Sequence, residues 1–541
     1  MPALRIRTGV GTEQLPFAPG GSLADILRAT PYPVRQPCGG RGRCGGCRVR
    51  VTEGTTGDPT VAERRFLSFE QVRNGTRLAC QLSPAADLSV EIIDQALAWR
   101  ELRDDEYAPV SPPSVVPDLS TRPASLGVAV DLGTTEIRVT VWDTVRGRRL
   151  GGCTGPNPQS AFGADVLSRL GTASWRREDA AAIGRVARDA IGDAIGYVLR
   201  RARLDRSEVG RVVVVGNTAM LSLLTECGYD ALLEPDNWAR EIDCPVPDAG
   251  AWVRSWGLSS GARVDVARSL AGFVGSDLLA DVLATGMTER SAKTLLIDFG
   301  TNSEIAVWDG TTLWATSTPG GPAFEGCGTE FGVPAGPGAV YRVRPRDGSG
   351  AFDCDAIGDP PPRGLCGSAL VDVIASLVRD GRLKESGNFA REVGDAGVVI
   401  VGGEPGLVLR KRDVDAFQRA KAAIGAGTRC LLEEAGVPFS GLERVCVCGA
   451  FGRSLDVSNA QRVGLLPGGV CLGRFEMWGN AALAGCELLL QAPEGVTTLD
   501  RTRSNARLVN LARVPTFDDR FLESLYLEPA RETRMTEGEP A

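Results

Sequence analysis

A sequence pattern that occurs twice, 167 residues apart, places the strongest constraint on how this chain can fold. In each copy an apolar strand ends at an aspartate, Gly-Thr makes a turn, and apolar alternation resumes in a second strand. We therefore expect two similar half-domains, each beginning with a strand-turn-strand unit. The two copies are Val130-Asp131-Leu132-Gly133-Thr134-Thr135 and Ile297-Asp298-Phe299-Gly300-Thr301-Asn302.

Length and patterning indicate a multidomain protein. The 541 residues suffice for about three or four domains of roughly 150 residues each. A hydrophobic share of 43% can bury sizeable cores. The N-terminal part has mixed α/β patterning and is followed by a Pro-rich linker. We expect a short helix at residues 95–102, at the start of this linker. Strands then alternate with helices, and the polar C-terminus is expected to be disordered. The proposed segments are 1–95, the linker 96–125, the half-domains 126–290 and 291–527, and the tail 528–541.

Composition excludes several classes of site. The chain has no histidine, so Ser-His-Asp triads, Cys-His pairs, His-ligated zinc proteases and Rieske clusters cannot form. None of its four lysines completes a Walker A loop. A net charge of -7 argues against a nucleic-acid partner. The N-terminus does not resemble a secretion signal and no segment is apolar enough to span a membrane, so we expect a cytoplasmic protein.

Four cysteines near the N-terminus have the spacing of an iron-sulfur ligand set. Cys38, Cys44 and Cys47 lie on a Gly- and Arg-rich loop, and Cys80 follows 33 residues later. Three cysteines on one loop favour a 2Fe-2S cluster, whereas a zinc ribbon, the alternative, uses two matched pairs. The other eleven cysteines are expected to be buried thiols. The segment resembles the adrenodoxin-type 2Fe-2S ferredoxins, which implies a β-grasp fold with these four cysteines as cluster ligands.

The repeated turns are suited to phosphate binding, because their N-H and hydroxyl groups can face phosphate oxygens while the aspartates hold Mg²⁺. A third element, residues 445–452, ends a strand in small residues that would let a nucleotide approach the backbone. These elements resemble the phosphate-1, phosphate-2 and adenosine motifs of the actin-like superfamily of kinases and ATPases. The resemblance implies that ATP and Mg²⁺ are bound by Asp131, Gly133, Thr134 and Thr135, by Asp298, Gly300, Thr301 and Asn302, and by Gly449, Ala450, Phe451 and Gly452.

Two further elements lie in the second half-domain. Glu304 follows the second turn and is our candidate for orienting an attacking water, since no histidine can act as the base. With Asp298 it forms the proposed catalytic pair. Gly364-Leu365-Cys366-Gly367-Ser368-Ala369 opens a helix, where it either binds phosphate or allows tight packing.

The whole chain resembles the reductive activators of corrinoid-dependent enzymes. This implies a multidomain α/β and α+β protein with a β-grasp 2Fe-2S ferredoxin domain, a Pro-rich linker and a two-lobed actin-like ATPase domain of the duplicated ribonuclease-H-like type. Further segments that carry the resemblance are Asn157-Pro158-Gln159, residues 163–169, residues 215–220, residues 321–326 and Gly464-Leu465-Leu466-Pro467.

The implied activity is ATP-dependent transfer of one electron from the cluster to Co(II), which regenerates Co(I). The partners would be a corrinoid protein or cobalamin-dependent methyltransferase and an upstream reductase, and we leave a homodimer open. Without histidine the chain lacks the D-x-H-x-x-G corrinoid motif, so we expect it to act on a corrinoid protein rather than to carry the cofactor. Two alternatives stay open, a redox-regulated small-molecule kinase and a nucleotide-binding redox sensor.

Overall fold

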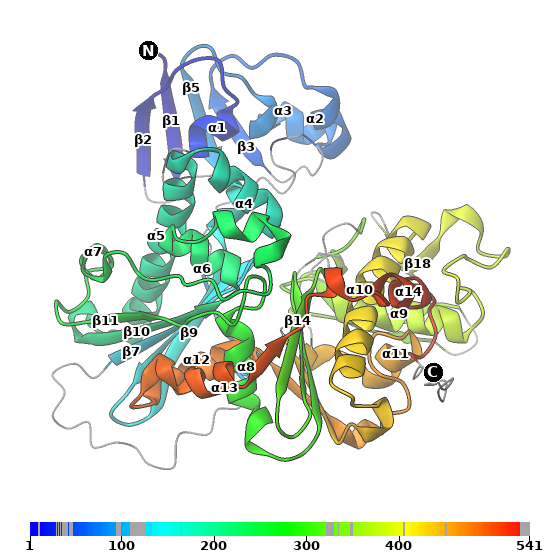
Figure 1. The fold of residues 1–541 in the computed structure, drawn as a ribbon. Helices are drawn as coiled ribbons and strands as arrows, with labels where there is room; N and C mark the ends of the chain where they lie inside the picture. Colours follow the sequence, from blue (N-terminus) through cyan, green and yellow to red (C-terminus); the bar gives the residue numbers. More distant parts are fainter. Residues whose placement is uncertain are drawn as a thin grey trace. The chain divides into compact units, whose positions relative to one another are not determined.

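The computed structural model, drawn in Figure 1, contains three larger sheets and two smaller ones in the residues that it describes. Its contacts divide it into two compact units: residues 1–102, 112–275 and 489–496 form one, and residues 103–111, 276–488 and 497–541 the other. In the part of the chain that the structure describes, no helix is long and apolar enough to cross a membrane. The described residues are 1–8, 11–28, 30, 32, 34, 40, 42, 47–92, 99–108, 126–163, 165–320, 329–333, 335–346, 350–403, 406–449 and 452–530.

Residues 1–92 build a five-stranded mixed sheet in the order β2-β1-β5-β3-β4. Strands β1 and β5 are parallel, and the other neighbours are antiparallel. Alternating residues such as Leu4, Ile6 and Val90 are fully buried on one face, as the period of two in a strand requires. This is the strand order expected of a β-grasp domain. Its elements are β1 (Ala3–Thr8), β2 (Gly11–Pro16), α1 (Leu23–Arg28), β3 (Arg48–Glu53), α2 (Val61–Phe66), α3 (Phe69–Arg73), β4 (Thr76–Leu78) and β5 (Leu88–Ile92).

The next sheet has six strands in the order β11-β10-β7-β8-β9-β6. Helices α4, α5 and α6 pack together, and α5 covers β8 and β9 (Figure 1). Small and β-branched residues of α5, among them Ala187, Ile191 and Ile195, are fully buried in this core. The elements are β6 (Arg100–Glu101), β7 (Leu126–Leu132), β8 (Glu136–Asp143), β9 (Arg148–Pro156), α4 (Val166–Trp175), α5 (Arg177–Ala202), β10 (Val209–Gly216), α6 (Thr218–Thr225), α7 (Ala249–Ser255) and β11 (Arg263–Val266).

The remaining unit is built on a second six-stranded sheet, in the order β21-β20-β12-β13-β14-β22. Helix α10 packs on β13 and β14, and α9 packs on β15. The elements are α8 (Ser276–Thr285), β12 (Thr294–Phe299), β13 (Ser303–Trp308), β14 (Leu313–Thr318), β15 (Ala339–Pro345), β16 (Phe352–Ala356), β17 (Gly364–Leu365), α9 (Gly367–Arg379), β18 (Val398–Val401), β19 (Leu407–Leu409), α10 (Lys411–Glu434), β20 (Arg444–Cys448), α11 (Val457–Arg462), β21 (Phe475–Gly479), α12 (Ala481–Gln491), α13 (Asp500–Ser504), β22 (Ala506–Leu508) and α14 (Phe517–Glu523).

Five strands of each six-stranded sheet share one topology, which confirms the duplication expected from the repeated sequence. The sixth strands differ, because β6 pairs antiparallel with β9 whereas β22 pairs parallel with β14. Strand β7 pairs antiparallel with β8 and parallel with β10, and β12 pairs antiparallel with β13 and parallel with β20. The next strands outward, β11 and β21, are again parallel to their neighbours. The repeated motifs are therefore equivalent turns, one between β7 and β8 and the other between β12 and β13.

Two expectations from the sequence need correction. The helix expected at residues 95–102 is wrong where the structure describes it, because Arg100 and Glu101 form β6 and pair with β9. The Trp99 ring lies so close to Gly155 that a Cβ there would be 2.6 Å from it, and this packing holds the segment extended beside the sheet. The expected C-terminal tail is ordered at its start, since Ala530 pairs with Pro467. The Pro-rich stretch 109–125 and residues 531–541 lie outside the described residues.

Candidate functional site

Strand pairing brings two of the four candidate cluster cysteines together. Cys47 directly precedes β3, and Cys80 lies just after β4, its antiparallel neighbour. The Ala79 N-H donates to the Cys47 carbonyl at 2.8 Å, which ties the two segments at the level of the cysteines. Cys38 and Cys44 lie outside the described residues. Within the described part of the chain, no group of three or more Cys, His, Asp or Glu side chains is arranged to hold a metal ion.

Hydrogen-bond donors converge on the Cys80 sulfur. The Cys47 thiol lowers the pKa of Cys80 to about 6, with further hydrogen bonds from the Gln81 amide and the Gly42 N-H and an opposing effect from burial. Gly42 has a φ of +67°, and a Cβ there would lie 2.8 Å from Gln81 Nε2, so the loop approaches only because it has glycine at this position. A thiolate-stabilising environment with close backbone fits an iron-sulfur ligand. Cys47 and Cys80 would hold the cluster, with Cys38 and Cys44 completing the set.

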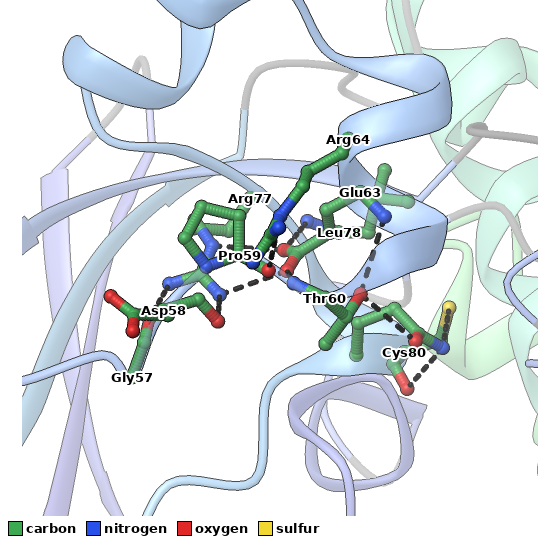
Figure 2. A network of polar contacts seen from close by, with 10 residues as sticks. Gly57, Asp58, Pro59, Thr60, Glu63, Arg64, Arg77, Leu78 and Cys80 are labelled. Atoms are coloured by element: carbon green, nitrogen blue, oxygen red, sulfur yellow. Dashed lines mark hydrogen bonds and ion pairs between the residues drawn. The ribbon is translucent and has the colours of Figure 1, made fainter.

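A buried ion pair supports the Cys80 segment. Glu63 on α2 is 0% exposed and accepts hydrogen bonds from Arg77 Nε and Nη2, both at 2.9 Å. Glu63 also accepts from the Leu78 N-H and the Thr60 N-H. Burial opposes ionisation, but these bonds hold the pKa of Glu63 below its usual range. Figure 2 shows the network of Arg77, Glu63 and Thr60, which the Gln81 amide connects to the Cys80 sulfur.

Replacing Arg77 by methionine is expected to destabilise the N-terminal domain by about 3–5 kcal/mol, because Glu63 would be left as an uncompensated buried charge. Hydrogen exchange of the amides of β3 and β5 in the full chain measures this loss. The matched control is the double variant E63Q/R77M, in which glutamine still accepts from the two N-H groups and no buried charge remains. It should recover much of the loss. Equal exchange in R77M and the unmodified chain would contradict this account of the pair.

The first phosphate-type turn, between β7 and β8, is anchored through its carbonyl oxygens. The buried Asn157 side chain donates to the Gly133 carbonyl at 2.8 Å, and its N-H donates to the Thr135 carbonyl at 2.8 Å. Arg169, 1% exposed, donates to the Thr134 carbonyl at 2.7 Å. Because C=O and the following N-H point in opposite directions in a trans peptide, the N-H groups of Thr134 and Thr135 are directed away from these anchors. This geometry fits a phosphate group.

The charged residues of this turn form an ion-pair chain. Asp131, 5% exposed at the end of β7, is the cross-strand partner of Arg138 on β8. Arg138 donates to Asp131 at 3.5 Å and to Glu136 at 2.6 Å. The shorter of these two bonds goes to Glu136. Asp131 therefore lies, with Glu136, in an ion-pair chain at the end of β7.

The second turn, between β12 and β13, brings together three of the predicted site residues. Asp298 and Glu304 are directly opposite each other in the antiparallel pair, so their side chains lie on the same face of the sheet. Cys448, which precedes Gly449, is the parallel neighbour of Asp298. Gly449 has a φ of +88°, and a Cβ there would lie 2.6 Å from Asp298 Oδ1. The two carboxylates with close backbone fit Mg²⁺, which usually binds one or two carboxylates together with phosphates.

The two turns differ in the charge of the residue that lies opposite the aspartate. At the position opposite the aspartate, the first turn has Arg138 and the second has Glu304. The second turn therefore concentrates negative charge, and burial together with Asp281 and Asp298 raises the pKa of Cys448 well above its usual value. A cation at the second turn would relieve this repulsion. Ala450 and Phe451 lie outside the described residues, and Gly452 begins a short 3₁₀ turn.

For the helix-opening segment at Gly364, the structure favours packing. A Cβ on Gly364 would lie 2.5 Å from the Phe331 carbonyl, and the Leu365 N-H already donates to that carbonyl at 2.7 Å. The Ser368 hydroxyl donates to the Tyr341 carbonyl at 2.6 Å. The segment that leads into α9 is thus closely covered by neighbouring backbone, and the glycine at position 364, in β17, is explained by that approach.

Most of the other described cysteines are buried or half-buried, as expected. Burial raises the pKa of Cys153 and of Cys446 to about 12, which keeps both thiols protonated. Cys471 is the exception, because it is exposed at the start of a short 3₁₀ turn. Cys327 lies outside the described residues.

Sequence reasoning assigned no role to Asn157, Arg169, Thr60 or Gln81. Asn157 and Arg169 lie in segments that carry the family resemblance. A single buried arginine that binds a turn carbonyl produces no helix or strand periodicity in the sequence, so its role could not be recognised there. Thr60 with Glu63 has the T-x-x-E pattern of a capping box, which the structure confirms. That pattern would have located helix α2, but not its connection to Cys80.

Comparison with known families covers most of the chain. Residues 8–85 match the 2Fe-2S iron-sulfur cluster binding domain, residues 126–290 match the RACo middle region, and residues 292–537 match the C-terminal domain of RACo, the ASKHA domain. Each matched segment contains one of the elements described above: the cysteine pair, the first turn, and the second turn with Gly449.

Two curated proteins and one solved structure are similar over most of their length. The corrinoid activation enzyme RamQ of Eubacterium limosum is 31% identical over 429 residues, covering 73% of this chain and 69% of that protein. The [Co(II) methylated amine-specific corrinoid protein] reductase of Methanosarcina barkeri is 27% identical over 395 residues, covering 68% and 70%. A reductive activator for a corrinoid, iron-sulfur protein has the same fold, with a TM-score of 0.66, 24% identity, and coverage of 98% of this chain and 99% of that one.

Proposed function

Because the chain belongs to the RACo family of reductive activators of corrinoid proteins, we propose that it passes one electron to the Co(II) ion of a corrinoid protein in an ATP-dependent step, which regenerates Co(I). A 2Fe-2S cluster at Cys38, Cys44, Cys47 and Cys80 supplies one-electron transfer. The observation that carries the proposal is the convergence of donors on Cys80 in a chain that also has an anchored phosphate-type turn and a second turn with two facing carboxylates. A redox-regulated kinase and a nucleotide-binding redox sensor would also use the cluster, so the substrate screen and the Co(I) assay separate them from this proposal.

The nucleotide has a thermodynamic task in this proposal. Clusters of plant-type ferredoxins have potentials near about -400 mV, and each ~59 mV by which the donor falls short costs a factor of ten for one electron. Binding of Mg-ATP offsets the shortfall if the chain then prefers the client state whose cobalt is easier to reduce, because a ligand shifts an equilibrium only by its differential affinity.

We assign the nucleotide to residues of all three elements. Gly133, Thr134 and Thr135 would offer N-H and hydroxyl groups to phosphate oxygens, as would Gly300, Thr301 and Asn302. Asp131 and Asp298 would hold Mg²⁺, Glu304 would orient the attacking water, and Gly449, Ala450, Phe451 and Gly452 would accommodate the adenosine. Asn157 and Arg169 would act as positioning residues, since they bind the carbonyls of the first turn.

The client belongs to the demethylase corrinoid proteins or is a methionine synthase without its own activation domain, and a separate reductase supplies the electron. In this proposal the ferredoxin domain comprises residues 1–95 and is joined to the ATPase lobes through residues 96–125, of which Arg100 and Glu101 are held in the first six-stranded sheet. The ATPase lobes comprise residues 126–290 and 291–527.

Metal analysis and a substrate screen test the proposal against its rivals. We expect two iron and two acid-labile sulfide per chain, visible absorption that bleaches on reduction, and no phosphoryl transfer to added sugars or carboxylates. Zinc in place of iron, without visible absorption, would contradict the electron-transfer function. Rapid phosphorylation of one added small molecule would instead support the kinase alternative.

A further inference from the structure

The side chain of Gln81 bridges the Cys80 sulfur and the Thr60 hydroxyl. Its Nε2 lies 3.5 Å from Cys80 Sγ and 3.3 Å from the Cys80 carbonyl oxygen. At the other end its Oε1 accepts from Thr60 Oγ1 at 3.2 Å. One amide therefore connects a candidate cluster ligand to the start of helix α2.

The chemistry at each end determines which way this amide points. Two acceptors, the Cys80 sulfur and the Cys80 carbonyl, surround one end, so that end must be the NH₂ group. The reversed amide would place its oxygen against both acceptors and lose both bonds. The Thr60 hydroxyl accepts from the Glu63 N-H at 3.2 Å and keeps its own proton for Gln81 Oε1. The donor on the sulfur side is thus set by the network.

Thr60 is itself held in place by buried groups. It is the N-cap of α2, and its N-H donates to Glu63 Oε2 at 2.9 Å in a reciprocal capping box. Glu63 is paired with Arg77 on the strand that leads to Cys80 (Figure 2). The Thr60 hydroxyl that orients Gln81 is therefore held in place by the capping box with Glu63, and Glu63 is in turn held by Arg77.

Gly42 lies directly against the side-chain amide of Gln81. Gly42 approaches Gln81 so closely that any Cβ would lie 2.8 Å from Nε2 and 3.1 Å from Cδ. The amide thus lies between Gly42 and the Cys80 segment, and this restricts the side-chain conformations that Gln81 can adopt. A donor held in one orientation loses little freedom when the charge on the sulfur changes.

We propose that Thr60 and Gln81 form a relay that holds an N-H donor on the Cys80 sulfur and so raises the reduction potential of the cluster. Reduction adds negative charge to the cluster and its sulfurs, and a hydrogen bond to sulfur is stronger in that state. Gln81 acts on the ligand directly, and Thr60 is a positioning residue that acts through Gln81. The inference rests on the cluster in the proposed function, but not on ATP or the corrinoid client.

The test is the midpoint potential of the full-length, cluster-loaded protein, measured by redox titration followed by visible absorption and electron paramagnetic resonance. Q81M keeps the length of the side chain and removes the donor. We expect it to shift the equilibrium toward the oxidised cluster by at least about threefold, roughly 30 mV for one electron. T60V removes the hydroxyl and should shift the potential in the same direction. T60S keeps the hydroxyl and the cap, and should leave the potential unchanged.

The double variant distinguishes a relay from two separate effects. If Thr60 acts through Gln81, T60V/Q81M has the potential of Q81M alone. An additive shift, or a loaded Q81M cluster with unchanged potential, would overturn the proposal. If Q81M does not retain its cluster, the potentials of T60V and T60S are compared instead, because Thr60 is not a cluster ligand. Equal potentials of these two variants would overturn the relay. Absence of a cluster from the unmodified chain would count against the proposed function instead.

Discussion

Asp298→Ala is expected to abolish ATP-dependent reduction of the corrinoid client while leaving the absorption of the iron-sulfur cluster unchanged. Asp298 ends β12, lies opposite Glu304, and is approached by Gly449 to within a distance that excludes any side chain there. Removing this carboxylate takes away a Mg²⁺ ligand in our assignment and leaves Glu304 alone. We expect the affinity for Mg-ATP to fall by about 10- to 100-fold, on the scale of the losses seen when groups that support a metal are removed.

Calorimetric titration with Mg-ATP and an anaerobic activation assay measure the two effects. The matched control is Asp353→Ala, which removes an exposed aspartate of the same unit that pairs with Arg346. Exposed pairs contribute about 0–1 kcal/mol, so this variant should bind and activate like the unmodified chain. Full ATP-dependent activation by the Asp298 variant would refute the assigned nucleotide role.

Cys80→Ser is expected to have the complementary phenotype: no electron transfer to the client with Mg-ATP affinity retained. Cys80 follows the end of β4 of the N-terminal sheet by two residues, whereas the phosphate-type turns connect strands of the six-stranded sheets. Serine removes the thiolate that accepts from the Gln81 amide and the Gly42 N-H. Iron content, visible absorption and Mg-ATP titration of one preparation give the readouts.

Cys471→Ser is the control for this substitution, because Cys471 is exposed and distant in sequence from the cluster loop. It should keep its iron, its nucleotide affinity and its activity. If Cys80→Ser retains a full cluster and full activity, Cys80 is not a ligand. If it loses nucleotide affinity as well, the two functions are not separable in the way proposed.

Features of the site that arise from local patterns could be predicted from the sequence. Each D-x-G-T motif is a strand end followed by a turn, so its structure is set by neighbouring residues, and both motifs form the turns expected of them. The placement of Cys80 beside Cys47 was likewise implied by a familiar spacing. The shared topology of the two sheets followed from the repeat.

Features that depend on distant packing could not be predicted in this way. Arg169 reaches the Thr134 carbonyl across 35 residues, and Arg77 pairs with Glu63 across 14 residues and a change of element. Neither separation is a helix or strand period. Arg100 and Glu101 join the first sheet, although a helix was expected there, because Trp99 packs against Gly155. In such cases the tertiary fold, and not the neighbouring sequence, determines which residue a side chain or strand contacts.

The most direct test of the central claim is the formation of Co(I) by the reduced protein under anaerobic conditions. The reduced chain is mixed with a Co(II) corrinoid protein, and the Co(I) absorption band is followed with and without Mg-ATP. We predict that Co(I) forms only with Mg-ATP, and that no more than one Co(I) appears per cluster oxidised. Equal Co(I) formation without nucleotide would contradict the coupling. Absence of Co(I) with an intact cluster, across competent demethylase and methionine synthase corrinoid proteins, would contradict the electron transfer itself.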